Sequence, residues 1–161
     1  MFLTQIFGWG SIMLSLVFSV GGTAVGKQRP KVYTAKDGSK RAVTPQKTRV
    51  YEALVKHEAQ HAIEHMIQKP DFSAPCEVSI DVYYTVPKSY TKKQRRQIAE
   101  SGAWVVRPGK PDLDNVIKSI LDGMNGIIYR DDVQVVSLRA KKHWCEGDEL
   151  PRVDVKVEWG D

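Results

Sequence analysis

The chain has 161 residues, of which 42% are hydrophobic and 27% charged, and its formal net charge is +5. This length and composition predict one globular domain with one hydrophobic core, and they exclude a repeat or low-complexity protein. Cys76 and Cys145 lie far apart and belong to no paired motif, so the sequence favours a reducing compartment over a disulfide scaffold.

The first 20 residues are apolar enough for a secretory or membrane segment to be considered, and no charged residue occurs before Lys27. This stretch has no basic beginning, however, and Gly8, Gly10 and several serines interrupt it. We therefore expect no membrane association.

Positive charge gathers between Lys27 and Lys56, a segment with nine basic and two acidic residues and a net charge of +7. Within it, Asp37-Gly38 is a turn signal between Val32-Tyr33 and Ala42-Val43, and this pattern predicts two short paired strands. A segment with this charge is suited to bind a polyanion. We expect a mobile loop that faces DNA.

A long helix is predicted to begin with Thr44 as its N-cap and Pro45 as its first residue, and to end near Lys69-Pro70. Within it, residues 57–61 satisfy the His-Glu-x-x-His pattern of zinc metalloproteases. A catalytic zinc needs a third protein ligand, and His65 lies one turn further along the same helix, where three imidazoles in a row cannot easily surround one ion. We interpret the histidines as a polar helix flank and keep a zinc metalloprotease as an alternative.

Alternating apolar residues predict further strands over residues 78–86, 104–106, 133–144 and 152–159. Thr91 is placed to cap a helix that ends around Gly102. A second cluster of cations lies at the start of this helix and comprises Lys88, Lys92, Lys93, Arg95 and Arg96. Strands and helices follow one another without a regular βαβ repeat, which predicts a compact, single-domain α+β fold with a mixed β-sheet packed against helices.

Carboxylates and one lysine are concentrated in residues 110–135. Asp112 and Asp114 stand two apart after a proline, where the chain is extended and both carboxylates can converge on one hard cation. Asp114 is also placed to cap the helix that follows. Lys118 and Asp122 come at i+4 and i+8 from Asp114, so an acid, an ammonium and an acid lie along one face of that helix.

This arrangement indicates metal-dependent phosphodiester cleavage. A Mg²⁺ or Mn²⁺ ion held by carboxylates neutralises a phosphate and lowers the pKa of a bound water, and a lysine offsets charge that develops in the transition state. On spacing alone a second interpretation stays open, because acids at a helix start are common caps and a Lys/Asp pair at i and i+4 is usually a solvated ion pair.

The full pattern resembles the signature of RusA-type Holliday-junction resolvases, the crossover-junction endodeoxyribonucleases of phages and prophages. Its parts are Asp112-Leu113-Asp114-Asn115, then Lys118, then residues 121–126, then Asp131-Asp132-Val133-Gln134-Val135. Residues 25–31 and 44–49 are similar to the family's basic N-terminal segment and to the start of its first helix. The resemblance covers roughly residues 14–159 and implies a RusA-like fold.

Carried over by motif, the resemblance assigns catalysis to Asp112, Asp114, Lys118 and Asp132. The three aspartates among them are expected to hold Mg²⁺, with Mn²⁺ able to replace it. Asp122 matches an acid of the family pattern and Asp131 adjoins Asp132, so both are auxiliary candidates. The DNA contacts are expected to come from five cations, Lys27, Arg29, Lys31, Arg41 and Lys110.

The resemblance also implies the setting of the protein. It implies a homodimer that cuts branched DNA, chiefly four-way junctions, in recombination and repair, within the cytoplasm of a bacterium or a phage-infected host. It places the first strand at residues 14–20, which leaves 1–13 as an apolar extension and 14–161 as the endonuclease domain. We expect Met13 to be the native start, because Trp9-Gly10 requires the codons TGG-GGN, a run of guanines where a ribosome-binding site would lie.

Three functions remain to be separated. A resolvase predicts metal-dependent incision of junctions. A non-catalytic module that binds branched DNA predicts junction affinity that does not depend on Asp112 and Asp114. A zinc metalloprotease predicts stoichiometric zinc that is lost when His57 or His61 is changed.

Overall fold

The computed structural model describes residues 13–100 and 111–160. Within these residues, four strands form a mixed sheet in the order β1, β6, β4, β5. Their bounds are Leu14–Gly21 for β1, Cys76–Tyr84 for β4, Val135–Trp144 for β5 and Arg152–Trp159 for β6. Strand β6 is antiparallel to both of its neighbours, whereas β4 and β5 are parallel. The expected α+β fold with a mixed sheet is confirmed.

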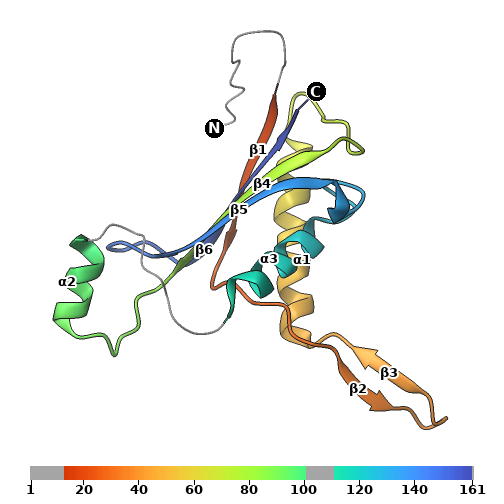
Figure 1. Cartoon of the computed structure of the whole chain (residues 1–161), viewed down its shortest axis with the longest axis horizontal. Helices are drawn as coiled ribbons and strands as arrows, with labels where there is room; N and C mark the ends of the chain where they lie inside the picture. The colour runs from red at the N-terminus through yellow and green to blue at the C-terminus, as the bar shows by residue number, and fades with distance from the viewer. Residues whose placement is uncertain (1–12, 101–110, 161) are drawn as a thin grey trace.

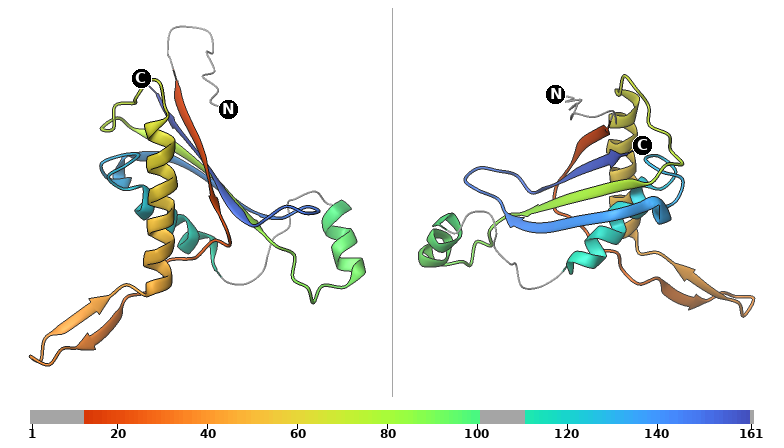
Figure 2. Two further views of the ribbon diagram at one scale, coloured as in Figure 1. Left: turned by 180° about the vertical axis from the view of Figure 1, so that it is seen from behind. Right: turned by 45° about the horizontal axis from the view of Figure 1, so that its top comes forward.

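The hydrophobic core lies between this sheet and two helices. Helices α1 (Gln46–Glu64) and α3 (Leu113–Met124) lie on the same side of the sheet (Figures 1 and 2). Because side chains alternate along a strand, every second residue of β4 and β6 points into this layer. The buried valines and isoleucine that do so are Val78, Ile80, Val82, Val153, Val155 and Val157.

Helix α1 differs from its predicted bounds at both ends. Pro45 rather than Thr44 is the N-cap, with φ −55° and ψ 143°, and no side chain caps this end. The helix ends at Glu64, whereas the sequence predicts an end near Lys69. The Lys69 ammonium reaches back and donates to the Glu64 carbonyl at 3.1 Å and to the Ile63 carbonyl, so it binds carbonyl groups that the helix leaves without an internal partner.

Helices α1 and α3 approach each other closely at Gly123. A Cβ atom at this position would lie 2.7 Å from Val55 Cβ and 3.0 Å from the Glu52 carbonyl oxygen. Such distances are too short for a side chain, so the helix contact requires glycine here. This contact sets how far α3, which carries most of the predicted site, stands from α1.

Strands β2 (Lys31–Thr34) and β3 (Lys40–Val43) form an antiparallel hairpin that projects from the rest of the molecule (Figure 1). Gly38 has φ 82°, a left-handed conformation that the turn needs and that glycine adopts readily. The Asp37 carboxylate accepts hydrogen bonds from the Ser39 N–H at 2.9 Å and the Ser39 hydroxyl at 2.6 Å, and these bonds lower the pKa of Asp37. The extended pair predicted from Asp37-Gly38 is confirmed.

Helix α2 (Lys92–Glu100) stands away from the hairpin, on the other side of the molecule in the view of Figure 1. Thr91 caps it as predicted: its hydroxyl accepts a hydrogen bond from the Gln94 N–H at 3.3 Å, and the Gln94 side chain accepts one from the Thr91 N–H at 2.8 Å. The predicted strand 104–106, Gly102, Lys110 and the extension up to residue 12 lie outside the described residues. None of the helices in the described ranges has both the length and the apolarity that crossing a membrane requires.

We expect Gly123→Ala to lower the free energy of unfolding by about 1–2 kcal/mol, because overpacking at Val55 outweighs the gain in helix propensity. Urea denaturation followed by circular dichroism measures this change. Gly21→Ala is the matched control, since a Cβ atom there has nothing within 4 Å, and it should change stability by less than about 0.5 kcal/mol. Equal effects of the two substitutions would contradict the proposed helix contact.

Candidate active site

The first two acids of the motif lie at the N-terminal end of α3. Asp112 is the N-cap residue, with φ −66° and ψ 146°, and Asp114 lies in the first turn. Asp114 therefore does not cap the helix, contrary to the sequence prediction, because the Asp112 carbonyl already accepts the hydrogen bond of the Val116 N–H at 3.1 Å. The Asp112 side chain makes no capping hydrogen bond, so its carboxylate is available to a ligand. Both acids are exposed, at the helix end that favours negative charge.

The Lys118 ammonium lies one turn further along α3, 3.6 Å from an Asp114 carboxylate oxygen. The side chains of Lys118 and Asp114 are 62% and 66% exposed, so this i to i+4 pair contributes little to stability. The pairing instead keeps a mobile ammonium beside the acid that the motif assigns to catalysis.

Two contacts hold the chain that leads into α3. The Lys142 ammonium, from β5, donates to the Pro111 carbonyl at 2.7 Å. On the other side, a Cβ atom at Gly26 would lie 2.8 Å from Pro111 Cβ and 3.2 Å from Asn115 Cβ, so the segment after β1 passes close against the start of α3. These contacts fix the backbone on both sides of Asp112. Sequence reasoning missed Lys142, because its distance of 31 residues from Pro111 leaves no local signal.

The second pair of acids lies in the short 3₁₀ turn before β5, and Gln134 fixes this turn. Its side-chain amide donates to the Phe72 and Ala74 carbonyls, both at 2.9 Å. Its side-chain oxygen accepts from the Arg130 N–H at 2.9 Å and the Asp131 N–H at 3.2 Å. All of these partners are backbone groups, so one glutamine ties the acid-bearing turn to the loop before β4. This gives a structural role to the glutamine of the sequence motif.

Asp131 and Asp132 have different environments. An Asp131 carboxylate oxygen accepts a hydrogen bond from the Val133 N–H at 3.1 Å and so caps the turn. Asp132 is exposed, yet limited desolvation, a hydrogen bond to Asp131 and the charges of Asp131 and Asp122 together raise its pKa. Crowded carboxylates of this kind favour a bound cation. The structure thus gives Asp131 a capping role and places the charges of Asp122 and Asp131 near Asp132.

Asp122, near the C-terminal end of α3, is bound by a lysine from another part of the chain. The Lys27 ammonium lies 2.6 Å from Glu52 of α1 and also contacts Asp122. Partial burial lowers the pKa of Lys27, but its hydrogen bonds and charge interactions with Asp122 and Glu52 outweigh this and give a net increase. Sequence reasoning assigns Lys27 to DNA, whereas the structure engages its ammonium with two carboxylates. Glu52 was not among the predicted site residues.

The predicted acids do not form one closed cluster. Asp122 influences Asp132 through its charge, whereas Asp112 lies ten positions before Asp122, about 15 Å away along a helix that rises about 1.5 Å per residue. Across residues 13–100 and 111–160, no three acids, histidines or cysteines converge closely enough to hold a metal ion. The donors themselves fit a hard divalent cation, because they are carboxylates of like charge. Among the ion pairs of the described chain, neither Asp112 nor Asp132 has a cationic partner.

The His-Glu-x-x-His segment lies on the exposed side of α1. His57 and His61 are exposed, and the His61 ring lies 4.3 Å from the ring of His65, whose Nδ1 is 2.7 Å from the His61 carbonyl oxygen. No residue in the described part of the chain completes a three-ligand site with them. This geometry agrees with a polar helix flank.

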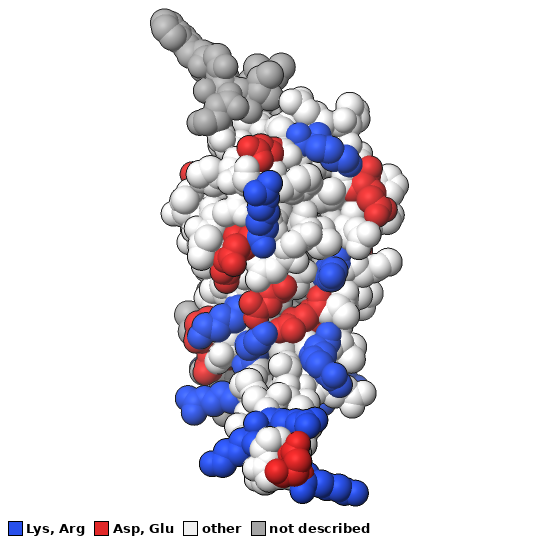
Figure 3. All heavy atoms as spheres, turned by 90° about the vertical axis from the view of Figure 1, so that its right-hand side faces the viewer, with Lys and Arg blue, Asp and Glu red and all other residues white. Residues whose placement is uncertain are grey.

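A groove of about 820 Å³ joins the start of α3 to the base of the hairpin. Its lining includes Asp112 and Asn115 on one side and Lys27, Arg29 and Lys31 on the other. Figure 3 shows that basic side chains predominate at the lower end of the molecule, where the hairpin lies. The groove therefore leads from an acid of the motif to a positively charged surface.

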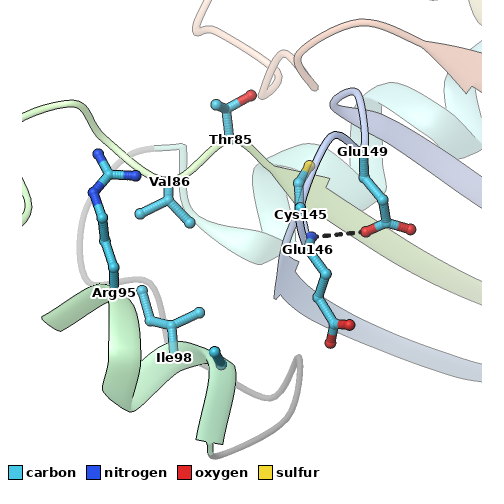
Figure 4. A pocket seen from close by; sticks show the side chains of 9 residues that line it. Thr85, Val86, Arg95, Ile98, Cys145, Glu146 and Glu149 are labelled. Atoms are coloured by element: carbon cyan, nitrogen blue, oxygen red, sulfur yellow. Dashed lines mark hydrogen bonds between the residues drawn. The ribbon is translucent and has the colours of Figure 1, made fainter. Parts of the chain in front are cut away.

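A second cavity of about 480 Å³ lies far along the sheet, between α2 and the turn after β5 (Figure 4). Figure 4 shows Ile98 and Arg95 of α2 on one side and Cys145 on the other. The turn is closed by a hydrogen bond from the Glu146 N–H to the Glu149 carboxylate at 2.9 Å. Burial raises the pKa of the Cys145 thiol, which disfavours the reactive thiolate.

Exposed carboxylates and a lysine on one helix, with Asp112 lining a groove that also has basic residues, fit an enzyme that cuts phosphodiesters. Comparison with known families gives the assignment. The model of the family described as Endodeoxyribonuclease RusA matches residues 21–158. The chain therefore belongs to the RusA family and is an endodeoxyribonuclease, a class of enzyme that acts on DNA.

Two relatives illustrate this membership. The protein named "Uncharacterized protein YqaN" of Bacillus subtilis (strain 168) is 34% identical over 143 residues, which cover 87% of this chain and 93% of that protein. The protein named "Crossover junction endodeoxyribonuclease rusA" of Lactococcus phage r1t is 30% identical over 86 residues, which cover 53% of this chain and 55% of that protein. The suspected family is confirmed.

We expect Gln134→Leu to destabilise the protein by about 1–3 kcal/mol, because it removes four hydrogen bonds to backbone groups of the acid-bearing turn. Thermal denaturation measures the loss. Gln60→Leu is the control, since Gln60 bonds only to the exposed Glu64 side chain, at 3.2 Å, among the hydrogen bonds of the described residues. A neutral Gln134 variant would show that the turn holds its shape without the glutamine.

We expect Asp132→Asn to raise the melting temperature at neutral pH in metal-free buffer. Because folding raises the pKa of Asp132, the folded state binds this proton more tightly than the unfolded chain does. The ionised side chain therefore opposes folding above its raised pKa, and this penalty disappears as the pH falls below the pKa of the unfolded chain, about 3.9. Melting curves between neutral pH and about pH 3 should converge with those of wild type. A constant difference at every pH would contradict the electrostatic cause.

Proposed function

We propose that this protein is a metal-dependent Holliday-junction resolvase that cuts four-way DNA at paired positions. The observation that carries the proposal is the presence of Asp112 and Asp114 at the start of α3, exposed and, in the case of Asp112, without a capping role. They lie on the motif of the RusA family of endodeoxyribonucleases, to which the chain belongs. The phage relative, named as a crossover junction endodeoxyribonuclease, supports the junction as substrate.

In this proposal Asp112, Asp114 and Asp132 hold Mg²⁺, with Mn²⁺ able to replace it. The ion would supply charge neutralisation at the phosphate and a lowered pKa for the attacking water. Asp112 and Asp114 would reach this ion from the start of α3, and Asp132 would reach it from the turn that Gln134 holds. Asp131, which caps the turn, and Asp122, which binds Lys27, act as auxiliary acids.

Lys118 is proposed to offset the negative charge that develops on the phosphate in the transition state. Its ammonium already lies beside Asp114 at 3.6 Å, and it is exposed enough to reorient toward a phosphate. An ammonium is suited to this task because it is a compact point charge on a flexible stem.

The basic groove and the hairpin are proposed to hold the DNA backbone. Arg29 and Lys31 line the groove beside Asp112, and Arg41 lies further out on the hairpin. Lys27 borders the same groove, and its ammonium would have to leave a carboxylate to bind phosphate. Lys110 lies outside the described residues and stays a prediction. Phosphate contacts of this kind position the substrate without specifying its sequence.

A homodimer is the proposed active form. A four-way junction has twofold symmetry, so two identical subunits can each supply one site and cut two strands at matching positions. The proposed setting is DNA recombination and repair in the cytoplasm of a bacterium or a phage-infected host.

The test is incision of an end-labelled four-way junction by wild type and Asp114→Asn in Mg²⁺, Mn²⁺ or EDTA, with linear duplex of the same arms as the control substrate. We expect paired nicks near the crossover that require the metal ion, and a rate lowered about 10²- to 10³-fold by Asp114→Asn or Lys118→Ala. Junction binding should persist in both variants, because the groove cations are unchanged.

Two further outcomes separate the alternatives. His57→Ala and Asp148→Asn should cut at the wild-type rate, because both residues are exposed and lie outside the proposed site. Junction binding without incision under every metal condition, from folded protein, would leave a DNA-binding module. Stoichiometric zinc that is lost in His57→Ala would reopen the metalloprotease alternative.

A further inference from the structure

The hairpin of β2 and β3 is fully exposed, and yet it carries large apolar side chains. All eight residues of β2 and β3 are exposed, and they include three large apolar side chains, Val32 at 64%, Tyr33 at 49% and Val43 at 40% exposure. A two-stranded hairpin is only marginally stable by itself. Nothing in the described part of the chain covers either of its faces, so the tyrosine ring stays in water unless a partner meets it.

The charge of the hairpin indicates what that partner is. Residues 31–43 contain four basic residues and one acidic residue, a net charge of +3. A surface of this sign attracts a nucleic acid and repels the same surface of a second copy of the chain.

The strand register places the ring among cations. Tyr33 pairs with Arg41, and Lys31 pairs with Val43. Because side chains alternate across a strand, Lys31, Tyr33 and Arg41 share one face of the hairpin, whereas Val32 lies on the other. The first face therefore has a flat ring flanked by two groups that can bind phosphate.

The hairpin begins at the groove that the first acid of the motif lines. Lys31 lines the same groove as Asp112, and Tyr33 follows two positions later, about 7 Å further along the strand. The ring therefore lies on the strand that leads out of the groove lined by Asp112.

We propose that Tyr33 stacks on a base at the branch point of the DNA while Lys31 and Arg41 bind the adjoining phosphates. This inference rests on the proposed function and adds the element that recognises the branch. Stacking of a base on an aromatic side chain contributes about 1–3 kcal/mol. A continuous duplex keeps its bases stacked on one another, whereas a crossover offers base faces that lack a stacked neighbour. The ring therefore favours branched DNA, which phosphate contacts alone do not distinguish from duplex.

The experiment measures binding in EDTA, where no cutting occurs, with 2-aminopurine at the crossover of a four-way junction. Wild type should change the fluorescence of this base, and Tyr33→Ala should abolish the change and weaken junction binding about 5- to 100-fold. Binding of linear duplex should change little. Tyr33→Phe should behave as wild type, because it keeps the ring.

Val32→Ala is the matched control, since it removes exposed apolar surface from the same strand on the opposite face. It should leave the fluorescence change and the preference for junction over duplex intact. The inference is overturned if Tyr33→Ala keeps both properties, or if Val32→Ala loses them equally. It is also overturned if Tyr33→Ala only converts a dimer into monomers in sedimentation, because the ring then contacts a second copy of the chain.

Incision by wild type in Mg²⁺ separates failure of this inference from failure of the proposed function. If wild type cuts the junction at paired positions and Tyr33→Ala retains its preference for branched DNA, the stacking role alone is wrong. If wild type neither binds nor cuts the junction, the proposed function fails and the stacking role fails with it.

Discussion

The ammonium of Lys27 lies between Glu52 of α1 and Asp122 of α3, and this contact decides how three parts of the molecule meet. The Lys27 N–H also donates to the Asn115 carbonyl at 2.7 Å, so backbone and side chain both bind α3. Each of the three ionic side chains is at most 35% exposed. Removing the lysine would leave two partly desolvated carboxylates facing each other. The course of the chain between β1 and the hairpin thus depends on the Lys27 ammonium, which is bound by one acid of α1 and one acid of α3.

The residues that hold the backbone around the site are mainly not the residues proposed to take part in catalysis. Gln134 holds the turn before β5, and Lys142 holds the chain before α3. Asp131 uses its carboxylate as a cap, so that its neighbour Asp132 does not have to. This division leaves the carboxylate of Asp112 without a capping role and so available to a ligand.

Local sequence patterns predict the strands and turns whose formation depends on residues close together in the chain. Alternation predicts β6 at its observed bounds, and Asp37-Gly38 predicts the hairpin. The predicted end of α1 is wrong: the helix ends at Glu64, and the Lys69 side chain binds its last carbonyl groups from outside the helix. The acids of the site follow from a motif, but the contact between Lys142 and Pro111 and that between Lys27 and Glu52 join distant residues. No pattern in a single sequence contains such pairs.

The parallel pairing of β4 with β5 has a consequence for how the enzyme folds. These two strands are separated by residues 85–134, a crossover that contains α2, α3 and the turn with both later acids. Parallel pairing over such a distance requires the chain to lose the entropy of closing a long loop before stabilising contacts form, so the pairing is slow. Strand β5 also supplies the lysine that fixes the chain before α3. Nuclease activity should therefore emerge during refolding only once β4 and β5 have paired.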